Sequence, residues 1–484
     1  MIISAWLNFI GFLTCVSDLL ILVYIKLTFV YILIYIKYKN MSTQIYYMEE
    51  RHRLLLVKQN PWWQGGQEEL PAFERDLMGE LMRYLERKQI IALAGLRRTG
   101  KTVLLKQIIS KLKTKPNNKC YISFDDVEFQ DYRLAGDLVN YFLEFSDKAG
   151  VRYLFLDEAQ KLPNWQDLLK VLYDTESKLK VFVSGSSGLD LGSSKETLAG
   201  RILTFHLPVM SFAEFARYSG LKANVGAGKI EREYDLHFGQ QKARYMEAFV
   251  SYLQRGGFPE LAGAADEEFV KKYIRESVVE KVAADIAKSS SAPQKTIFDM
   301  MRMLSASNAQ LVEVVNLAKA LGISRITATK YLGMLEKSFF TRLAYNYTPS
   351  VAKQVRQSKK QYVAHSSIAM AMLDYPFSSL RTTAAGLLVE GVVANSVNNP
   401  FFWRSAQKDE VDIVSKSGMP VEVKYTTDIS TSDTRPILKF CAKYGRSEAV
   451  VVTKDIFETR RYGNIKITFV PAWFFLLSAG KLMK

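Results

Sequence analysis

Short apolar runs alternate with longer amphipathic stretches in the first half of the chain. Residues 90–94, 153–156 and 181–183 are uninterrupted apolar runs, and each ends in a polar or glycine-containing segment. Such runs predict strands that are buried on both faces, as in a parallel sheet covered by helices. Apolar positions in residues 103–112 recur at helical spacing. The first half therefore predicts an α/β fold.

Beyond residue 211 the pattern becomes helical and polar, which predicts a lid-like helical subdomain. Residues 317–321 and 324–337 follow as two helical segments joined at Gly322, with Ser324 placed to cap the second. This spacing predicts a helix-turn-helix followed by a wing. On its second helix we expect Ile326, Tyr331, Leu332 and Leu335 to pack inward, and Ser324, Arg325, Thr327, Thr329 and Lys330 to face outward.

Near the C-terminus the pattern changes to alternation with a period of two. Residues 410–425, "EVDIVSKSGMPVEVKY", predict two strands joined by a Gly-Met-Pro turn. Alternation places Asp412 on one face of its strand, and Glu422 and Lys424 together on one face of the next. A helix predicted over residues 386–399 carries Glu390.

The N-terminal leader is strongly apolar. Residues 1–36 contain only Asp18 and Lys26 as charged side chains, and the stretch is long enough to span a bilayer. Lysines and arginines follow directly, which would keep the body in the cytoplasm. A second interpretation is that the chain starts at Met41 and residues 1–40 are a mis-assigned extension. The pattern supports both, so we expect a cytoplasmic protein, either free or tethered to the inner membrane by residues 1–36.

Composition limits the classes of function. A chain of 484 residues is too long for one core and predicts two to four domains. The net charge of +16 favours a polyanionic partner, such as DNA or RNA, or an anionic membrane surface, although a merely basic soluble protein fits too. The three cysteines are far apart, which excludes a disulfide framework and a zinc-type cluster.

The clearest chemical signal is "GLRRTGKT", residues 95–102, between the first apolar run and the first helix. It fits the P-loop pattern, in which backbone N–H groups wrap a nucleotide's phosphates. Lys101 is suited to the β- and γ-phosphates, and the Thr102 hydroxyl to Mg²⁺. The expected nucleotide contacts are Gly95, Arg98, Thr99, Gly100, Lys101, Thr102 and Val103.

A metal-side carboxylate is expected at the end of a second strand. Asp157 and Glu158 follow the apolar run at residues 153–156. Ligands of a parallel sheet lie outside the carboxyl ends of its strands, so Asp157 should face Thr102 across the metal. Glu158 is then placed to activate the attacking water. This pair predicts hydrolysis rather than binding alone.

These segments resemble a known family. "GLRRTGKT", "FLDEAQ", "VSGSS" and "LAGRILTFHLPVMSFAEF" are similar to the ATPase core of a broad prokaryotic AAA-type family with a poorly understood C-terminal domain. The similarity runs from about residue 41 to the C-terminus and includes "LLLVKQNPWWQ" and "RGGFPEL". It implies ATP as the nucleotide, and Arg201 as a candidate contact for the γ-phosphate; a surface ion pair is the alternative. Arg97 and Arg98 would serve the nucleotide or a neighbouring copy of the chain, which implies possible self-association.

The C-terminal strands resemble PD-(D/E)XK nucleases. The resemblance implies that Asp412 and Glu422 hold Mg²⁺, Lys424 steadies the nucleophile or the phosphate charge, and Glu390 completes the acidic pocket. Two other interpretations stay open: a strand pair whose charges face water, and a nuclease fold without chemistry. Lys353, Arg356, Lys359 and Lys360, just upstream, favour nucleic acid.

The expected architecture has a P-loop parallel sheet, a helical lid, a winged helix-turn-helix and a C-terminal α/β nuclease-like domain. After the leader at 1–40, the expected bounds are 41–210, 211–288, 289–360 and 361–484. The expected function is an ATP-hydrolysing, Mg²⁺-dependent switch acting on nucleic acid. The alternative is a regulatory ATPase whose C-terminal domains are inactive protein-docking modules. The sequence leaves the physiological substrate, the oligomeric state and the preference for ATP over GTP open.

Overall fold

The structure is a computed structural model that describes residues 50–186, 198–226, 228–381 and 384–483. The predicted leader and the alternative start at Met41 lie outside these ranges. Within them, no helix combines the length and the apolarity that crossing a bilayer requires. The chain divides into two compact units, of which the smaller takes in residues 1–68 and 133–145.

The described part of the smaller unit is helical. Residues 50–59 form a helix, Pro61–Gln64 (η2) forms a 3-10 turn, and residues 133–145 belong to α5 (Tyr132–Phe145). The Trp63 and Phe145 rings pack with their centroids 5.4 Å apart.

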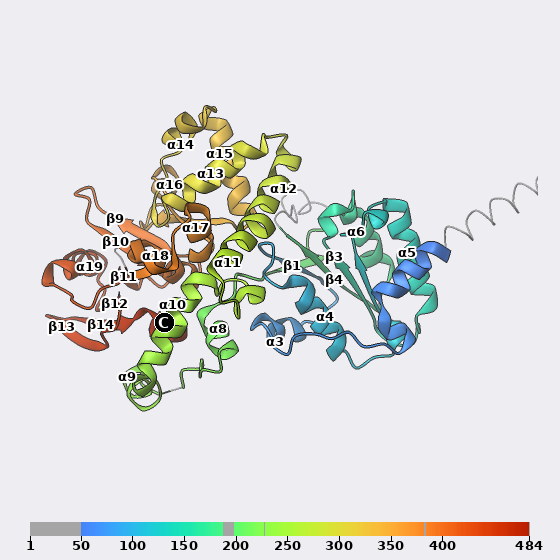
Figure 1. The fold of residues 1–484 in the computed structure, drawn as a ribbon, viewed down its shortest axis with the longest axis horizontal. Helices are drawn as coiled ribbons and strands as arrows, with labels where there is room; N and C mark the ends of the chain where they lie inside the picture. The colour runs from blue at the N-terminus through green and yellow to red at the C-terminus, as the bar shows by residue number, and fades with distance from the viewer. Residues whose placement is uncertain (1–49, 187–197, 227, 382–383, 484) are drawn as a thin grey trace, which may run out of the picture. The chain divides into compact units, whose positions relative to one another are not determined.

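The larger unit begins with a five-stranded, wholly parallel sheet in the order β2-β3-β4-β1-β5 (Figure 1). The predicted parallel α/β sheet is therefore confirmed. Its strands are β1 (Ile90–Ala94), β2 (Lys119–Ser123), β3 (Arg152–Asp157), β4 (Leu179–Gly185) and β5 (Ile202–His206). Helices α3 (Leu77–Met82), α4 (Lys101–Lys111) and α6 (Trp165–Thr175) belong to the same part of the chain.

A helical region follows the sheet. A run of helical backbone extends from residue 267 to residue 290 without a break and includes one π-helical stretch, Ile274–Val279 (η9). The α-helices of the region are α8 (Phe212–Tyr218), α9 (Ile230–Glu233), α10 (Lys242–Arg255), α11 (Glu267–Tyr273), α12 (Glu280–Ser290) and α13 (Gln294–Ala306).

Helices α14 (Val314–Leu321) and α15 (Arg325–Lys337) form the expected helix pair. Gly322 ends α14 with φ +64°, a left-handed conformation that suits glycine. Ser324 caps α15 by accepting a hydrogen bond from the Thr327 amide at 3.0 Å. Tyr331, Leu332 and Leu335 are buried as expected, but the inward placement of Ile326 was wrong, because its side chain is 84% exposed.

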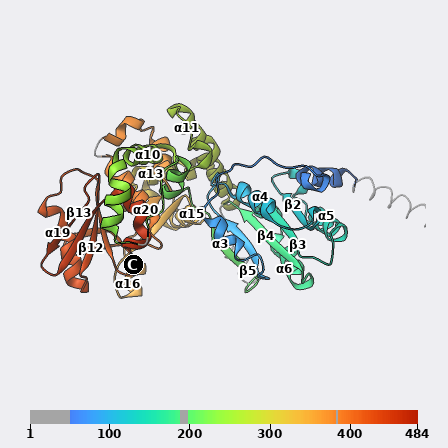
Figure 2. The same ribbon diagram turned by 90° about the horizontal axis from the view of Figure 1, so that it is seen from below.

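A second sheet of nine strands occupies the C-terminal half, in the order β13-β14-β12-β11-β10-β9-β7-β8-β6. Figure 2 labels β12 and β13 of this sheet. Its strands are β6 (Gln310–Leu311), β7 (Thr341–Asn346), β8 (Lys360–Val363), β9 (Phe401–Arg404), β10 (Glu410–Val414), β11 (Pro420–Lys424), β12 (Glu448–Thr453), β13 (Glu458–Tyr462) and β14 (Ile465–Pro471). The antiparallel hairpin β7–β8 follows the helix pair, and β7 continues the sheet by pairing in parallel with β9. One sheet thus runs through both segments that the sequence treated separately.

The helices of this half are α16 (Val351–Arg356), α17 (Ser366–Leu373), α18 (Ala384–Ser396), α19 (Thr431–Tyr444) and α20 (Ala472–Leu482). The β10–β11 hairpin has the two strands expected over residues 410–425, in antiparallel register with Ile413 opposite Val421. One hydrophobic core joins α11–α15 and α17, and it includes Leu96 from the loop after β1.

Candidate functional site

The glycine loop after β1 has a backbone that favours glycine at two positions. A Cβ added at Gly95 would lie 2.3 Å from the carbonyl oxygen of Leu207, so a side chain does not fit there. Gly100 has φ +93° and directly precedes α4. The amino end of α4 therefore points into the loop, which is the arrangement that favours an anionic ligand.

Lys101 and Thr102 begin α4, and their side chains take different directions. Lys101 is 5% exposed, and its Nζ donates to the carbonyl oxygens of Gly95 at 3.0 Å and Leu96 at 2.9 Å. Burial lowers the pKa of Lys101, while the nearby charges of Glu158 and Asp157 oppose that shift. The Thr102 hydroxyl donates to the Asp157 carboxylate at 2.7 Å.

The acidic pair ends β3 on the same side of the sheet. Asp157 is 1% exposed and also accepts hydrogen bonds from the hydroxyls of Tyr121, at 2.7 Å, and Ser184. Glu158 has φ +53° and is 8% exposed. Its carboxylate accepts from the Gln160 amide at 2.5 Å and the Ser186 hydroxyl at 3.2 Å. The structure thus brings Lys101, Thr102, Asp157 and Glu158 into one site.

The remaining loop residues contact protein groups. The Thr99 hydroxyl donates to the Leu96 carbonyl at 2.9 Å, and Val103 is half-buried on α4. Arg97 and Arg98 form ion pairs with Asp285, at 2.8 Å, and Glu260, at 3.4 Å. Both arginines are thus paired within the chain.

Arg201 lies at the other end of the sheet. Its carbonyl accepts from the amide of Ile90, the first residue of β1, whereas the glycine loop follows the last. Its guanidinium pairs with Asp174 at 2.9 Å. The structure therefore shows the surface ion pair, and it does not bring Arg201 to the glycine loop of its own chain.

Arg75 is a site residue that the sequence analysis missed. It is 5% exposed, and its guanidinium donates to the Thr99 carbonyl at 2.5 Å, to the Pro208 carbonyl at 2.8 Å and to Glu214 at 2.9 Å. It thereby fixes the glycine loop to α8. Its partners lie 24 to 139 residues away, so no local pattern marks it.

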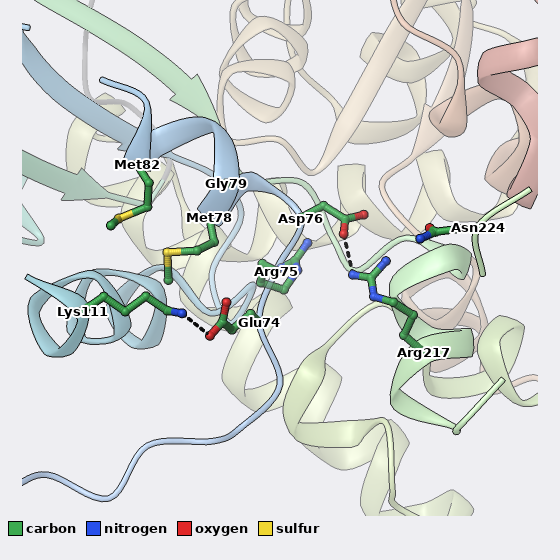
Figure 3. A pocket seen from close by; sticks show the side chains of 9 residues that line it. All are labelled: Glu74, Arg75, Asp76, Met78, Gly79, Met82, Lys111, Arg217 and Asn224. Carbon is green, nitrogen blue, oxygen red and sulfur yellow. Dashed lines mark hydrogen bonds and ion pairs between the residues drawn. The ribbon is translucent and has the colours of Figure 1, made fainter. Parts of the chain in front are cut away.

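A cavity of about 530 Å³ opens beside Arg75 (Figure 3). Ion pairs Glu74–Lys111, at 2.8 Å, and Asp76–Arg217 lie along its walls. The cavity lining is Glu74, Arg75, Asp76, Met78, Gly79, Met82, Lys111, Arg217 and Asn224. Each charged side chain of the lining already has an ion-pair partner, which for Arg75 is Glu214 outside the lining, so the cavity offers no unpaired charge for a ligand.

The C-terminal acidic residues come together around a lysine. Lys360 of β8 is 2% exposed, and its Nζ lies 2.6 Å from Glu390, 2.8 Å from Glu410 and 3.1 Å from Asp412. Lys424 lies 2.9 Å from Glu422 instead. Lys360, which the sequence analysis counted among the basic residues that favour nucleic acid, is buried in this cluster instead. In the described ranges, no three His, Cys, Asp or Glu side chains are grouped so as to hold a metal ion.

Burial changes the acid-base behaviour of this cluster. It raises the pKa of Glu390 to about 8 and that of Glu422 to about 8, and the charge of Asp412 adds to both shifts. Burial alone would lower the pKa of Lys360, but the surrounding carboxylates hold it well above its usual value. These carboxylates therefore favour the charged form of Lys360. Lys360 is the first residue of β8, and its partners lie 30 to 52 residues away in the chain, so no local pattern marks its role.

Comparisons with known proteins bear on the first site. Residues 87–216 match the family model of an AAA domain. Residues 246–379 and 384–475 match two models described as domains of unknown function, DUF8612 and DUF4143. The match to an AAA domain, over the segment that holds the glycine loop and the acidic pair, supports an AAA-type P-loop ATPase.

Two of the proteins with similar sequences are uncharacterised. An uncharacterised protein of Methanocaldococcus jannaschii is 29% identical over 346 residues, which cover 66% of this chain and 71% of that protein. An uncharacterised protein of Mycobacterium tuberculosis is 27% identical over 373 residues, covering 74% and 75%. A signal transduction ATPase with numerous domains from Pyrococcus horikoshii is 11% identical and covers 67% of this chain and 45% of its own, with a TM-score of 0.25, which is too low to support an inference.

Proposed function

We propose that this protein is a Mg²⁺-dependent ATPase that acts as a switch on nucleic acid. The observation that carries the proposal is the 2.7 Å hydrogen bond between Thr102 at the start of α4 and Asp157 at the end of β3. A hydroxyl and a carboxylate at this spacing offer the oxygen ligands that Mg²⁺ prefers. The ion would neutralise charge on the β- and γ-phosphates.

The side chains around this pair have separate roles in the proposal. Lys101 turns from the carbonyls of Gly95 and Leu96 to the phosphates, since these carry full negative charge. Glu158 orients the attacking water and accepts its proton, while Gln160 and Ser186 hold its carboxylate in place. The other proposed nucleotide contacts are Gly95, Arg98, Thr99, Gly100 and Val103. Arg201 contributes only if it reaches the site of another copy.

The helix-turn-helix is the proposed contact to DNA or RNA. Residues 314–359 contain eight lysines or arginines and one acidic residue. Four of these basic residues, Arg325, Lys330, Lys353 and Arg356, are exposed, and the described residues offer them no ion-pair partner. In the chain, α16 comes between β7 and β8. Unpaired basic side chains on α15 and α16 could form ion pairs with the phosphates of a duplex. The hairpin β7–β8 supports a winged form of the motif.

A second candidate function concerns the last domain. The order α18, β9, β10, β11, α19, β12 and the residues Glu390, Asp412, Glu422 and Lys424 support a nuclease-like fold. Lys360 lies where these carboxylates could otherwise share a metal ion. This placement favours the fold without cleavage, so that the domain acts as a docking module. Cutting of DNA or RNA by wild type in Mg²⁺ would contradict that assignment.

The test is ATP turnover in Mg²⁺ with and without single- and double-stranded DNA. We expect turnover by wild type, stimulation by one form of DNA, and a loss of about 100-fold or more in Glu158→Gln with Mg-ATP binding retained. Turnover that is equal in Glu158→Gln and wild type would exclude the proposed site. Turnover that DNA leaves unchanged at low salt would exclude the nucleic-acid switch and favour the regulatory docking alternative.

A further inference from the structure

Three consecutive residues of the glycine loop, Leu96, Arg97 and Arg98, contact a region more than 150 residues away. Leu96 is 1% exposed and lies in the core of the helices from α11 to α15. Arg98 pairs with Glu260, and its guanidinium lies 5.6 Å from the centre of the Tyr273 ring. The loop that would wrap the phosphates is therefore also part of the helical region.

The strongest of these contacts is between Arg97 and Asp285 of α12. Two hydrogen bonds join them, from Nε to Oδ2 at 2.8 Å and from Nη2 to Oδ1 at 3.0 Å. This paired geometry makes full use of the planar guanidinium. The side chains are 22% and 35% exposed, so the pair is partly shielded from water. Burial opposes the charge of Arg97, yet Asp285 keeps the pKa of Arg97 above its usual value.

Arg97 also interacts electrostatically with carboxylates of the proposed catalytic site. The carboxylates of Glu158 and Asp125 both attract its charge. Its own backbone belongs to the loop that would bind the phosphates. A triphosphate carries several negative charges where Asp285 carries one, and phosphate oxygens accept the same paired hydrogen bonds. Nucleotide and Asp285 can therefore compete for one guanidinium.

We propose that Asp285 is a positioning residue that holds Arg97 away from the nucleotide, and that Mg-ATP draws Arg97 from Asp285 to the phosphates. This inference rests on the proposed nucleotide site. Asp285 lies on the unbroken helical run of residues 267–290, and this run shares its core with α14 and α15. Release of Asp285 would thus pass the nucleotide state to the helix-turn-helix. By reciprocity, anything that holds α12 in place weakens nucleotide binding.

The experiment is a measurement of Mg-ATP affinity with four variants of the full chain. We expect Asp285→Asn to bind about threefold to tenfold more tightly than wild type, since the competing charge is gone. Asp285→Glu, which keeps the charge, should stay within about twofold of wild type. Arg97→Ala should bind about tenfold more weakly. In Arg97→Ala/Asp285→Asn the tightening should disappear, because Asp285 acts only through Arg97.

The control is Asp299→Asn, which removes the same charge from α13, where Asp299 pairs with Lys295 at 3.2 Å. It should bind like wild type. Two results would overturn the inference while leaving the nucleotide site intact. One is Mg-ATP binding by Asp285→Asn that is unchanged or weaker than that of wild type. The other is an equal gain in affinity from Asp285→Asn when it is added to Arg97→Ala. A wild type that binds no Mg-ATP would overturn both. Far-UV circular dichroism shows whether each variant is folded, and a variant that fails this check is replaced by Asp285→Ser.

Discussion

Lys360 forms the centre of a buried ion cluster drawn from three elements. Glu390 comes from α18, and Glu410 and Asp412 come from β10, while Lys360 itself belongs to β8. Buried charges are tolerated only while each keeps a partner. The lysine therefore ties β8, in the hairpin after α15, to α18 and to the C-terminal strand β10.

We expect Lys360→Met to lower the free energy of unfolding by about 3–5 kcal/mol, because it leaves buried carboxylates without a cation. Urea unfolding followed by circular dichroism measures the change. The matched control is Lys359→Met, next in the chain, whose ammonium lies 4.5 Å from the Tyr345 ring and is partly exposed. Its loss should cost about 1 kcal/mol or less. Equal effects of the two substitutions would contradict the role of Lys360.

The buried acid Glu422 makes stability depend on pH. Burial, together with the charge of Asp412, raises its pKa from the ordinary value of 4.5 to about 8. Between these values the folded chain keeps a proton that the unfolded chain has released. The free energy of unfolding should therefore fall as the pH rises from 5 to 8, by up to about 1.4 kcal/mol per pH unit for this proton.

Glu422→Gln should reduce this dependence by the contribution of one proton, since glutamine does not titrate, while Glu390, whose pKa is also raised to about 8, still contributes. Unfolding free energies at pH 5, 6, 7 and 8 measure the slope for both proteins. Glu448→Gln, at the exposed start of β12, serves as the control and should keep the wild-type slope. A slope that Glu422→Gln leaves unchanged would show that Glu422 does not hold the proton.

Among individual residues, the sequence predicted those site residues that a local pattern marks. The glycine loop and Asp157 with Glu158 were found because each follows an apolar strand, and the sheet brings such ends together. Arg75 was missed, and the buried role of Lys360 was not predicted, because their partners are distant in the chain. The position of Arg201 could not be read from local pattern either. The register of β5 beside β1 places it next to Ile90, and α6 supplies its partner Asp174.

Helix α15 was predicted correctly as a helix, but one residue, Ile326, was assigned to its buried face by mistake. Ile326 and Leu335 are nine positions apart, which is about half a turn from a whole number of turns at roughly 100° per residue. The two side chains therefore point in opposite directions, and burial of Leu335 exposes Ile326. Ile326 joins Arg325 and Lys330 on the outer face as an apolar side chain available to a partner.

We expect Lys330→Ala to weaken binding of duplex DNA and to reduce the slope of log affinity against log salt by about one, because one phosphate contact is lost. Fluorescence anisotropy at several salt concentrations measures both quantities. Lys295→Ala removes the same charge from α13, where it pairs with Asp299, and should change neither. Binding that does not depend on salt would contradict an electrostatic contact and favour protein docking.

At the scale of the molecule, the pattern predicted the α/β class but not how the segments join. The expected bounds at residues 288 and 360 rest on local pattern along the chain, whereas strand pairing is decided by contacts between residues that are distant in the sequence. The nine-stranded sheet passes from the hairpin into the C-terminal strands through the pairing of Tyr345 with Phe401. Leu96 likewise ties the glycine loop to the helical core.

These connections make the glycine loop the point from which the rest of the larger unit could respond to a nucleotide. The most direct test is isothermal titration calorimetry of Mg-ATP into wild type and Lys101→Ala. We expect saturable heat with one nucleotide per chain for wild type. Lys101→Ala should lose at least about 100-fold in binding, because it removes the ammonium that lies against the loop carbonyls of Gly95 and Leu96. No heat from folded wild type, or equal heat from both proteins, would contradict the proposed site.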